Sequence, residues 1–210
     1  MRDNMNGWRV LALIMIVLSS TAYTVWDWQF ETHRQIESEH LSLIQQLRYK
    51  EETLNLSIEF GFDPLIVLVT RQLASEAFQK EVQHPETTWR FIRTERDLTY
   101  LILSLIQIES RGDYKAFNPG GPAHGLTQLL LSTARMYDKD VTPGQLLTIP
   151  KNLTIAVAHF VDLLEKYHGN FTLAVLAWNR GGGGVDRSIS AGLLDSYAYQ
   201  VFTAALRNAK

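Results

Sequence analysis

The chain has 210 residues with a formal net charge of -2, and none of its residues is cysteine. This length allows one compact domain of ordinary size together with additional segments. A net charge so close to zero gives no argument that the chain as a whole binds nucleic acid. Without cysteine the chain has neither disulfides nor thiolate metal sites. The six histidines show no spacing typical of a metal centre, so we expect no metal and no cofactor.

The N-terminal segment is predicted to be a membrane anchor. Val10 to Trp26 contains no charged residue, and aromatic residues stand at both ends, as they do at the headgroup level of a bilayer. Arg2 and Arg9 precede this segment whereas acidic residues follow it, an order that favours an internal N-terminus. We therefore expect residues 1–28 to anchor the chain, with residues 10–28 in contact with the lipid bilayer.

This topology predicts a single-pass inner-membrane protein, N-in with its C-terminal domain in the periplasm, or a virion-associated protein if the chain is phage-encoded. Two alternatives stay open. Ser20-Thr21-Ala22 has the small side chains of a signal-peptide cleavage site, in which case the segment would be removed. The apolar run would also suit a buried helix of a soluble fold.

Residues 29–93 are predicted to form a helical stalk or accessory region. No glycine or proline interrupts Gln29 to Lys50, and part of this stretch has apolar residues at helical spacing. These apolar residues are Ile36, Leu43, Ile44 and Leu47. A further helix is predicted from Pro64 to about Gln83, because Asp63 suits the N-cap and proline suits the first turn.

From Thr94 onward the pattern predicts a mostly α domain of short helices joined by loops. A loop is expected at 111–124, and the four glycines of Gly181–Gly184 are expected to end a helix. Signals for β-strands are weak throughout. The helices are expected at 97–110, 126–137, 150–167, 171–179 and 197–208, with a short one near 142–145.

Glu109 is the strongest candidate for an acid catalyst. It ends a helix that is apolar over most of its length, so its carboxyl group emerges from a buried element. Burial raises the pKa of a carboxyl group, as a general acid that works near neutral pH requires. A glycine-rich and proline-rich loop follows, and then Gly125-Leu126-Thr127-Gln128.

This stretch resembles the Glu-Ser … Gly-Leu-Met-Gln core of the lytic transglycosylases, which are lysozyme-like enzymes that cut bacterial peptidoglycan. Ala177-Trp178-Asn179 is similar to the family's Ala-Tyr-Asn, and Asp195 to Val201 is similar to its Glu-Thr-x-x-Tyr-Val. The resemblance covers Thr94 to Val201. It implies a mostly α, lysozyme-like catalytic domain at residues 94–210, preceded by the membrane helix and the helical stalk.

The resemblance also implies roles for individual residues. Glu109 is the expected catalytic acid, and Gln128 is expected to hydrogen-bond a sugar or its acetamido group. Trp178 is expected to stack on a sugar through its apolar face, and Asn179 to point inward. Asn152 is expected to be a structural cap. The residues expected to bind substrate are Ser110, Asn118, Gly125, Leu126, Thr127, Gln128, Trp178, Asn179 and Tyr199.

Gly125 is expected to allow a close backbone approach, and Leu126 to pack inward. Thr127 replaces the family's usual methionine, which would alter a contact to sugar. Asn118 stands where the family has serine in Ser-Pro, and the hydroxyl of Tyr199 is expected near the catalytic acid.

The resemblance implies that Glu109 protonates the glycosidic oxygen between MurNAc and GlcNAc and then takes a proton from the MurNAc O6 hydroxyl. That hydroxyl attacks within the same sugar and gives a 1,6-anhydro end. A lysozyme-type alternative keeps the acid but uses water as the nucleophile. A second alternative is a catalytically weak glycan-binding component of an envelope-spanning machine for secretion, conjugation or phage genome entry.

Overall fold

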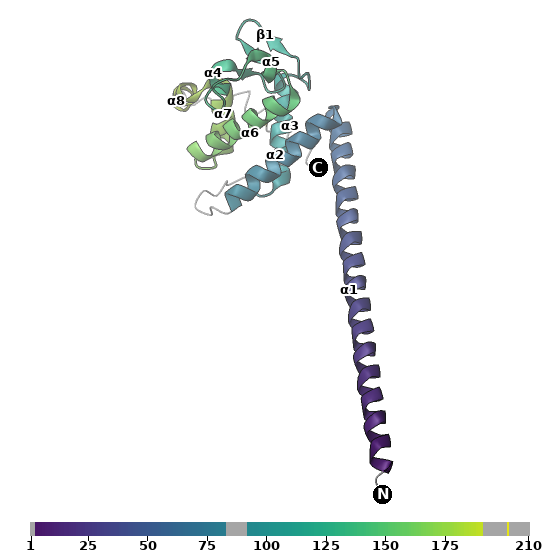
Figure 1. Ribbon diagram of the computed structural model, residues 1–210. Coiled ribbons are helices and arrows are strands. Elements are labelled where there is room, and N and C mark those ends of the chain that lie inside the picture. Colours follow the sequence, from purple (N-terminus) through teal and green to yellow (C-terminus); the bar gives the residue numbers. More distant parts are fainter. Residues whose placement is uncertain (1–2, 83–91, 191–200, 202–210) are drawn as a thin grey trace. The chain divides into compact units, whose positions relative to one another are not determined.

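The computed structural model describes residues 3–82, 92–190 and 201, and for part of the N-terminal helix it describes the backbone alone. The chain divides into two units, Met1–Glu52 and Thr53–Lys210. The described residues are mostly helical, as predicted (Figure 1). The helix predicted at 197–208 lies outside the described residues except for Val201, which is helical and buried.

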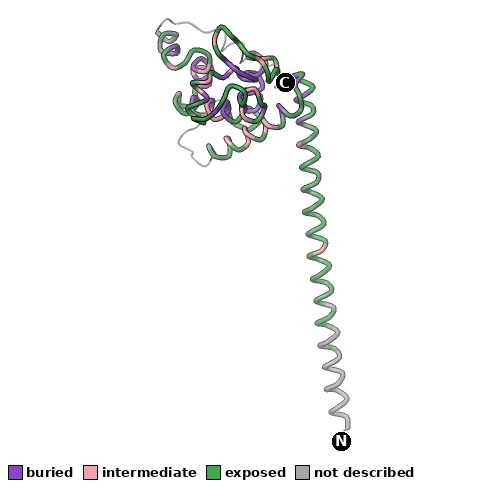
Figure 2. Tube along the Cα trace, turned by 45° about the horizontal axis from the view of Figure 1, so that its top comes forward, coloured by how far each residue is buried: buried purple, intermediate pink, exposed green. Residues whose placement is uncertain are grey.

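The first unit consists of helix α1, which runs without interruption from Asp3 to Phe60 and so continues into the second unit. The stalk predicted at 29–50 is therefore helical. Its side chains are almost all exposed (Figure 2). In the described part of the chain, no single helix combines the length and hydropathy of a membrane span. One bent pair, Ser19–Phe60 with Pro64–Lys80, passes by length and composition at an angle of 118°.

Helix α2, Pro64–Val82, begins where the sequence predicts it. The Asp63 carboxylate accepts a hydrogen bond of 2.8 Å from the Leu65 N–H, which caps the first turn. The helix packs against α3 and α6 and buries Ile66 and Val67 in the main core. The compact unit begins at Thr53 and includes α2, because α2 belongs to the same hydrophobic core as the helices that follow.

Helix α3, Glu95–Glu109, is the central element of that core. A capping box starts it: the Thr94 hydroxyl accepts from the Asp97 N–H, and the Asp97 carboxylate accepts from the Thr94 N–H. Nine consecutive residues, Leu98 to Ile106, are buried. A helix that is buried on every side is rigidly held, which fixes the position of its last residue.

The helix predicted at 126–137 is wrong over most of its length. Residues 125–128 form a turn, and the only helical part is α4, Leu131–Ala134. Gly125 and Gln128 have φ angles of 74° and 49°, in the left-handed region that interrupts an α-helix. The turn instead joins two strands of a small sheet.

This sheet contains three antiparallel strands: β1 (Phe117–Asn118), β2 (Ala123–His124) and β3 (Leu129–Leu130). Phe117 pairs with His124, and Ala123 pairs with Leu130. Each strand has two residues, too few to give the alternating pattern by which a strand is predicted.

The remaining helices are α5 (Pro143–Leu146), α6 (Ile149–Lys166), α7 (Phe171–Arg180) and α8 (Gly182–Ser190). The glycines at 181–184 end the helix that begins at Phe171, as predicted, but a further helix that was not predicted follows them. Gly181, with a φ of 66°, ends α7, and α8 begins at once. A Cβ at Gly184 would overlap the Arg180 side chain. The glycines therefore allow α8 to pack closely against the end of α7, with Val185 fully buried.

Two hydrophobic clusters lie in the second unit. The larger joins α2, α3, α6 and α7, and the smaller joins β3, α4 and α5 to the other face of α6. Trp178 of α7 packs against both clusters. Helix α6 thus lies between the two clusters and contributes residues to both.

Candidate active site

Glu109 lies where the buried helix α3 reaches the surface, and its side chain is half-buried. The N–H groups of Ser110 and Arg111 both donate to the Ile106 carbonyl oxygen, each at 3.0 Å, and close the helix end. Ser110 is the C-cap residue and is also half-buried. The sequence-based expectation that the carboxyl group emerges from an apolar helix agrees with this placement.

The chain turns sharply after the acid, and an aromatic cluster supports the turn. Arg111 and Gly112 have φ angles of 56° and 84°. A Cβ at Gly112 would lie only 2.7 Å from the Phe62 ring, so glycine is required for this contact. Phe62 packs on Phe60, and Phe60 packs on Tyr100, with ring centroids 5.5 and 5.9 Å apart. Phe60 and Phe62 lie before Thr94, and the sequence analysis assigned them no part in the site.

Ala116 joins the segment after Glu109 to the 125–128 turn. Its carbonyl oxygen accepts from the Gly125 N–H at 2.8 Å and from Nε2 of Gln128 at 3.2 Å. The same Nε2 also donates to the Gly125 carbonyl oxygen at 3.0 Å. Both N–H groups of the Gln128 amide are therefore used within the protein. The structure gives this side chain a role in holding the loop, and only its oxygen remains for a sugar.

Asn152 is a buried residue that holds the 125–128 turn by hydrogen bonds, and it is not the helix cap that the sequence predicted. The N-cap of α6 is Thr148, and Asn152 lies in the first turn beyond it with no exposed surface. Its Oδ1 accepts from the N–H and the hydroxyl of Thr127, at 3.2 and 2.8 Å. Its Nδ2 donates to the carbonyl oxygens of His124 and Leu146, both at 2.9 Å. One amide thus fixes both sides of the 125–128 turn.

These contacts also place Gly125, Leu126 and Thr127. A Cβ at Gly125 would overlap the Leu146 carbonyl oxygen, so the close approach expected for Gly125 is made to protein backbone. Leu126 is fully buried, as expected. Thr127 is 1% exposed, so the prediction that it contacts sugar is wrong: its hydroxyl is committed to Asn152.

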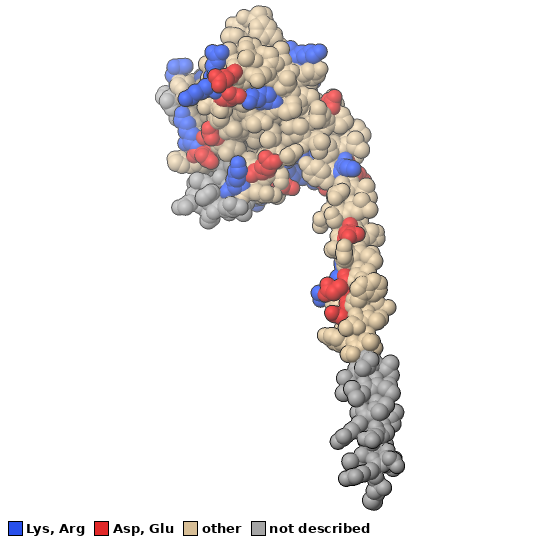
Figure 3. Space-filling view, in the orientation of Figure 1, with Lys and Arg blue, Asp and Glu red and all other residues tan. Residues whose placement is uncertain are grey.

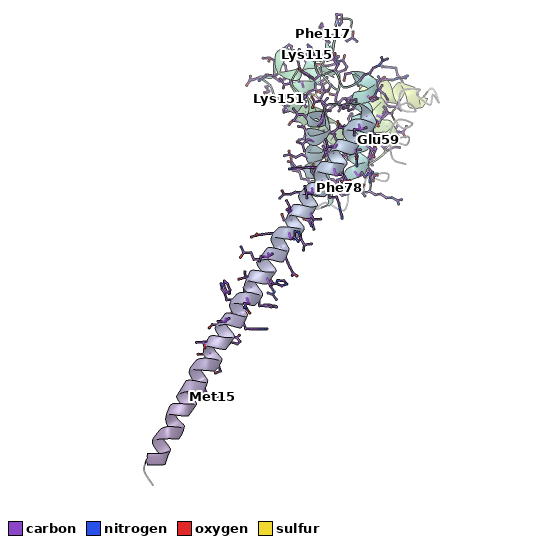
Figure 4. The ribbon with its side chains drawn as sticks, turned by 90° about the vertical axis from the view of Figure 1, so that its right-hand side faces the viewer. Met15, Glu59, Phe78, Lys115, Phe117 and Lys151 are labelled. Atoms are coloured by element: carbon purple, nitrogen blue, oxygen red, sulfur yellow. The ribbon has the colours of Figure 1, made fainter. Side chains whose placement is uncertain are left out.

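The loop between Glu109 and the turn presents exposed aromatic side chains that the sequence analysis missed. Tyr114 is 39% exposed and Phe117 is 54% exposed. The Lys115 ammonium lies 5.4 Å from the Tyr114 ring centroid, and the His124 ring lies 5.1 Å from that of Phe117. Figure 4 shows Lys115 and Phe117 together at one end of the second unit. Exposed aromatic rings suit contact with sugar faces.

Asn118 is exposed beside these aromatic residues, and its carboxamide oxygen accepts from the Gly120 N–H at 3.0 Å. Its first role in the structure is thus to form the tight turn between β1 and β2. It follows Phe117 on the same strand, so the two side chains point to opposite faces of the small sheet.

Trp178 and Asn179 differ from expectation. Trp178 is partly buried, with its ring 5.3 Å from His159 and 6.0 Å from Phe160. Its indole therefore packs in the fold, with part of its surface left open. Asn179 is exposed, so the prediction that it points inward is wrong, because α7 turns its small and aliphatic residues toward the core. Tyr199 lies outside the described residues.

A row of three hydrogen-bonded polar side chains, Asp162, Tyr137 and His159, lies beside Trp178. The Tyr137 hydroxyl donates to the Asp162 carboxylate at 2.6 Å and lies 3.0 Å from Nδ1 of His159. Because the hydroxyl proton goes to Asp162, His159 must donate from Nδ1. Burial lowers the pKa of His159, although Asp162 opposes this, and burial with the Asp162 hydrogen bond raises the pKa of Tyr137.

An ion pair between Lys151 and Asp138 lies at the surface of the second unit. Lys151 and Asp138 lie 2.5 Å apart, and this hydrogen bond lowers the pKa of Asp138. No group of three or more His, Asp or Glu side chains that could hold a metal ion occurs among the described residues.

Comparison with known families agrees with this geometry. Residues 92–192 match the family described as Transglycosylase SLT domain. This part of the chain is therefore an SLT-type, lysozyme-like domain. It includes α3 with Glu109, the Gly-Leu-Thr-Gln turn and helices α6 to α8.

Among solved structures, the chain is similar to the 70 kDa soluble lytic transglycosylase SLT70 from Escherichia coli. The sequence identity is 23% and the TM-score is 0.47. The match covers 52% of this chain and 21% of that chain, so it spans about a fifth of that protein.

Proposed function

We propose that the second unit cleaves the MurNAc–GlcNAc β-1,4 bond of peptidoglycan as a lytic transglycosylase, with Glu109 as its acid and base. The observation that carries this proposal is the position of the half-buried Glu109 at the end of helix α3, whose residues Leu98 to Ile106 are all buried, within an SLT-type domain. A rigid helix holds the carboxyl group in one place, as proton transfer to a glycosidic oxygen requires.

The number of carboxyl groups available for catalysis indicates which product forms, a 1,6-anhydro or a reducing MurNAc end. Most glycosidases that use water employ a second carboxylate, and Asp113, the next acid after Glu109, uses its Oδ1 to accept the Lys115 N–H at 2.9 Å. We therefore propose that the MurNAc O6 hydroxyl attacks and gives 1,6-anhydro ends. The same carboxyl group first donates a proton to the leaving oxygen and then accepts one from the attacking hydroxyl.

We propose glycan contacts for site residues whose side chains still have an exposed face or an unused polar group. Phe117 and Tyr114 offer ring faces, Asn118 offers its side-chain nitrogen, and Gln128 offers its amide oxygen. These groups come from the loop and turn that Ala116 ties together. Asn152 and Thr127 do not contact the glycan in this proposal; their hydrogen bonds hold the backbone of the 125–128 turn in place.

Glu109→Gln in the full chain tests the proposal. Release of soluble fragments from purified sacculi should fall by at least about 100-fold, since general acid–base catalysis contributes about 10²–10⁴-fold. Glu165→Gln, an exposed acid of α6, is the matched control and should keep full activity. If Glu109→Gln retains activity while circular dichroism shows an intact fold, Glu109 is not the acid.

Three features of the candidate site favour a second candidate function. Thr127 and the Gln128 amide nitrogen are committed to protein contacts, and Asn179 is exposed. A domain with these departures could bind glycan strands in an envelope-spanning machine without cutting them. Such a protein would pull down with sacculi at equal strength with and without the Glu109→Gln substitution, and it would release no fragments in either form.

We further propose that residues 10–28 anchor the chain in the inner membrane with the second unit in the periplasm. The charge-free run after Arg9 and the continuation of α1 through it support this topology. The protein should stay with membranes after carbonate washing, and a protease added to spheroplasts should digest the second unit. A soluble product that begins near Tyr23 would show a signal peptide instead.

A further inference from the structure

The exposed stretch of α1 from Trp26 to Glu52 carries a seven-residue repeat. Numbering Trp26 as the first position of a heptad puts Leu47 at the same position three heptads later and puts Ile36 and Leu43 at the fourth position. Phe30 and Ile44 occupy the neighbouring fifth position. The six apolar side chains form one stripe along the helix, and we call it the α1 stripe: Trp26, Phe30, Ile36, Leu43, Ile44 and Leu47.

Every residue of the α1 stripe is exposed. The exposed fractions run from 43% for Phe30 to 60% for Trp26. Gln29 and His33, near the start of the repeat, are polar residues at its fourth and first positions. Helix α1 is the only element among the described residues of the first unit, so no other element of that unit covers the stripe. On the face shown in Figure 3, charged side chains of this part of α1 lie beside uncharged ones.

The area of the stripe is close to what a stable pair of helices needs. With 43–60% of each residue's surface exposed, the six side chains could bury on the order of 100 Å² each, or roughly 600 Å² per helix, with the largest share from the two aromatic residues. A standard protein interface buries about 800 Å² per partner.

Two polar residues in the second half of the repeat identify the partner. His40 stands at the first heptad position and Lys50 at the fourth. In a parallel, in-register pair, a first-position residue lies beside the preceding seventh position of the partner, which is Glu39. A fourth-position residue lies beside the following fifth position, which is Glu51. Each of these two residues would thus meet an acid of the second copy, twice per pair by symmetry.

We propose that residues 26–52 of α1 bind the same residues of a second copy of this chain in a parallel, in-register coiled coil. The segment is complementary to itself in both shape and charge. An antiparallel pairing would bring other residues beside His40 and Lys50. A lipid surface would give no reason for a lysine and its acidic neighbour, Lys50 and Glu51, soon after the last apolar residue of the stripe.

Cysteine cross-linking tests the pairing in the full chain, since the protein has no cysteine of its own. Leu43→Cys and Leu47→Cys place thiols on the stripe, whereas Ser38→Cys and Gln45→Cys place them on the opposite face as matched controls. Under mild oxidation of membranes that contain each variant, the stripe variants should form disulfide-linked dimers several-fold more than the controls. Equal yields on both faces, or monomers alone, would overturn the proposal in favour of lipid or another protein.

Charge reversal tests the register. Lys50→Glu should reduce cross-linking of the Leu47→Cys protein several-fold, because it sets acid against acid. Lys50→Glu combined with Glu51→Lys should restore it, and Arg48→Glu, on an outer position, should leave it unchanged. If Lys50→Glu has no more effect than Arg48→Glu, the parallel register is wrong.

Discussion

At the scale of single residues, Asn152 uses all the hydrogen-bonding capacity of its amide inside the protein. It receives two hydrogen bonds from Thr127 and gives one each to His124 and Leu146, at 0% exposure. A buried polar group that loses its partner costs about 1–3 kcal/mol. Removing this one amide leaves several such groups behind, so its effect should exceed that of an ordinary polar substitution.

Asn152→Ala should lower the free energy of unfolding by roughly 3 kcal/mol or more, because the Thr127 N–H and two carbonyl groups lose their partner. Thr127→Val removes one hydrogen bond at nearly constant shape and should cost about 1 kcal/mol. Urea denaturation measures both. Equal, small effects would mean that the 125–128 turn is held by other contacts.

Phe117 offers the most exposed aromatic ring beside the 125–128 turn. Phe117→Ala should raise KM for glycan strands by about 3–10-fold, since an aromatic contact contributes about 0.5–1.5 kcal/mol, while kcat changes little. Met136→Ala, which alters another exposed apolar residue of the second unit, is the control and should leave KM unchanged. A fall in kcat at constant KM would instead place Phe117 near the reacting bond.

At the scale of elements, the row of polar side chains that ties Tyr137, just after α4, to α6 makes stability depend on pH. Burial lowers the pKa of His159 in the folded state. The unfolded chain therefore takes up the proton first as pH falls through about 6.5. Stability is complete above that value and declines below it, until the pH passes the lower folded pKa.

We therefore expect the wild-type unfolding midpoint in urea to fall between pH 7.5 and pH 5.5, and His159→Gln to reduce that fall. The other histidines titrate in both proteins, so the difference between the two profiles isolates His159. Parallel profiles would show that burial of His159 does not affect its protonation.

The predictable elements are those with long apolar patterns or clear caps. Asp63-Pro64 and the apolar run before Glu109 located α2 and α3 to within a few residues, because caps and helical spacing are local signals. The 125–128 turn was predicted as a helix because its left-handed residue Gln128 and the tie to Asn152, 25 residues away, leave no local signal. Helix α8 was missed because glycine usually ends a helix, whereas here it allows close packing.

The candidate site was predictable only in part for a related reason. Glu109 and its neighbours stand out by their order along the chain, and their family match confirms the domain. Side-chain direction depends on tertiary contacts. The sequence therefore predicted the direction of two side chains wrongly. Thr127, expected to contact sugar, is buried, and Asn179, expected to point inward, is exposed.

At the scale of the whole molecule, the folded unit extends well before the stretch that the family covers. Phe60 and Phe62 support the turn after Glu109, and Ile66 and Val67 are in the main core. A fragment of residues 94–210 would expose the faces of α3 and α6 that α2 covers. We expect it to be insoluble or unfolded, whereas residues 53–210 should give a cooperative thermal transition. A well-folded, active 94–210 fragment would show that α2 is dispensable.

The central claim is that one carboxyl group, Glu109, cleaves peptidoglycan with the substrate's own hydroxyl as nucleophile. Mass spectrometry of sacculi digested by the full chain tests this most directly, because a 1,6-anhydro end is one water lighter than a reducing end. We predict anhydro-MurNAc as the dominant new end, with none formed by Glu109→Gln. Reducing MurNAc ends as the main product would contradict the account and would place the enzyme among the hydrolases.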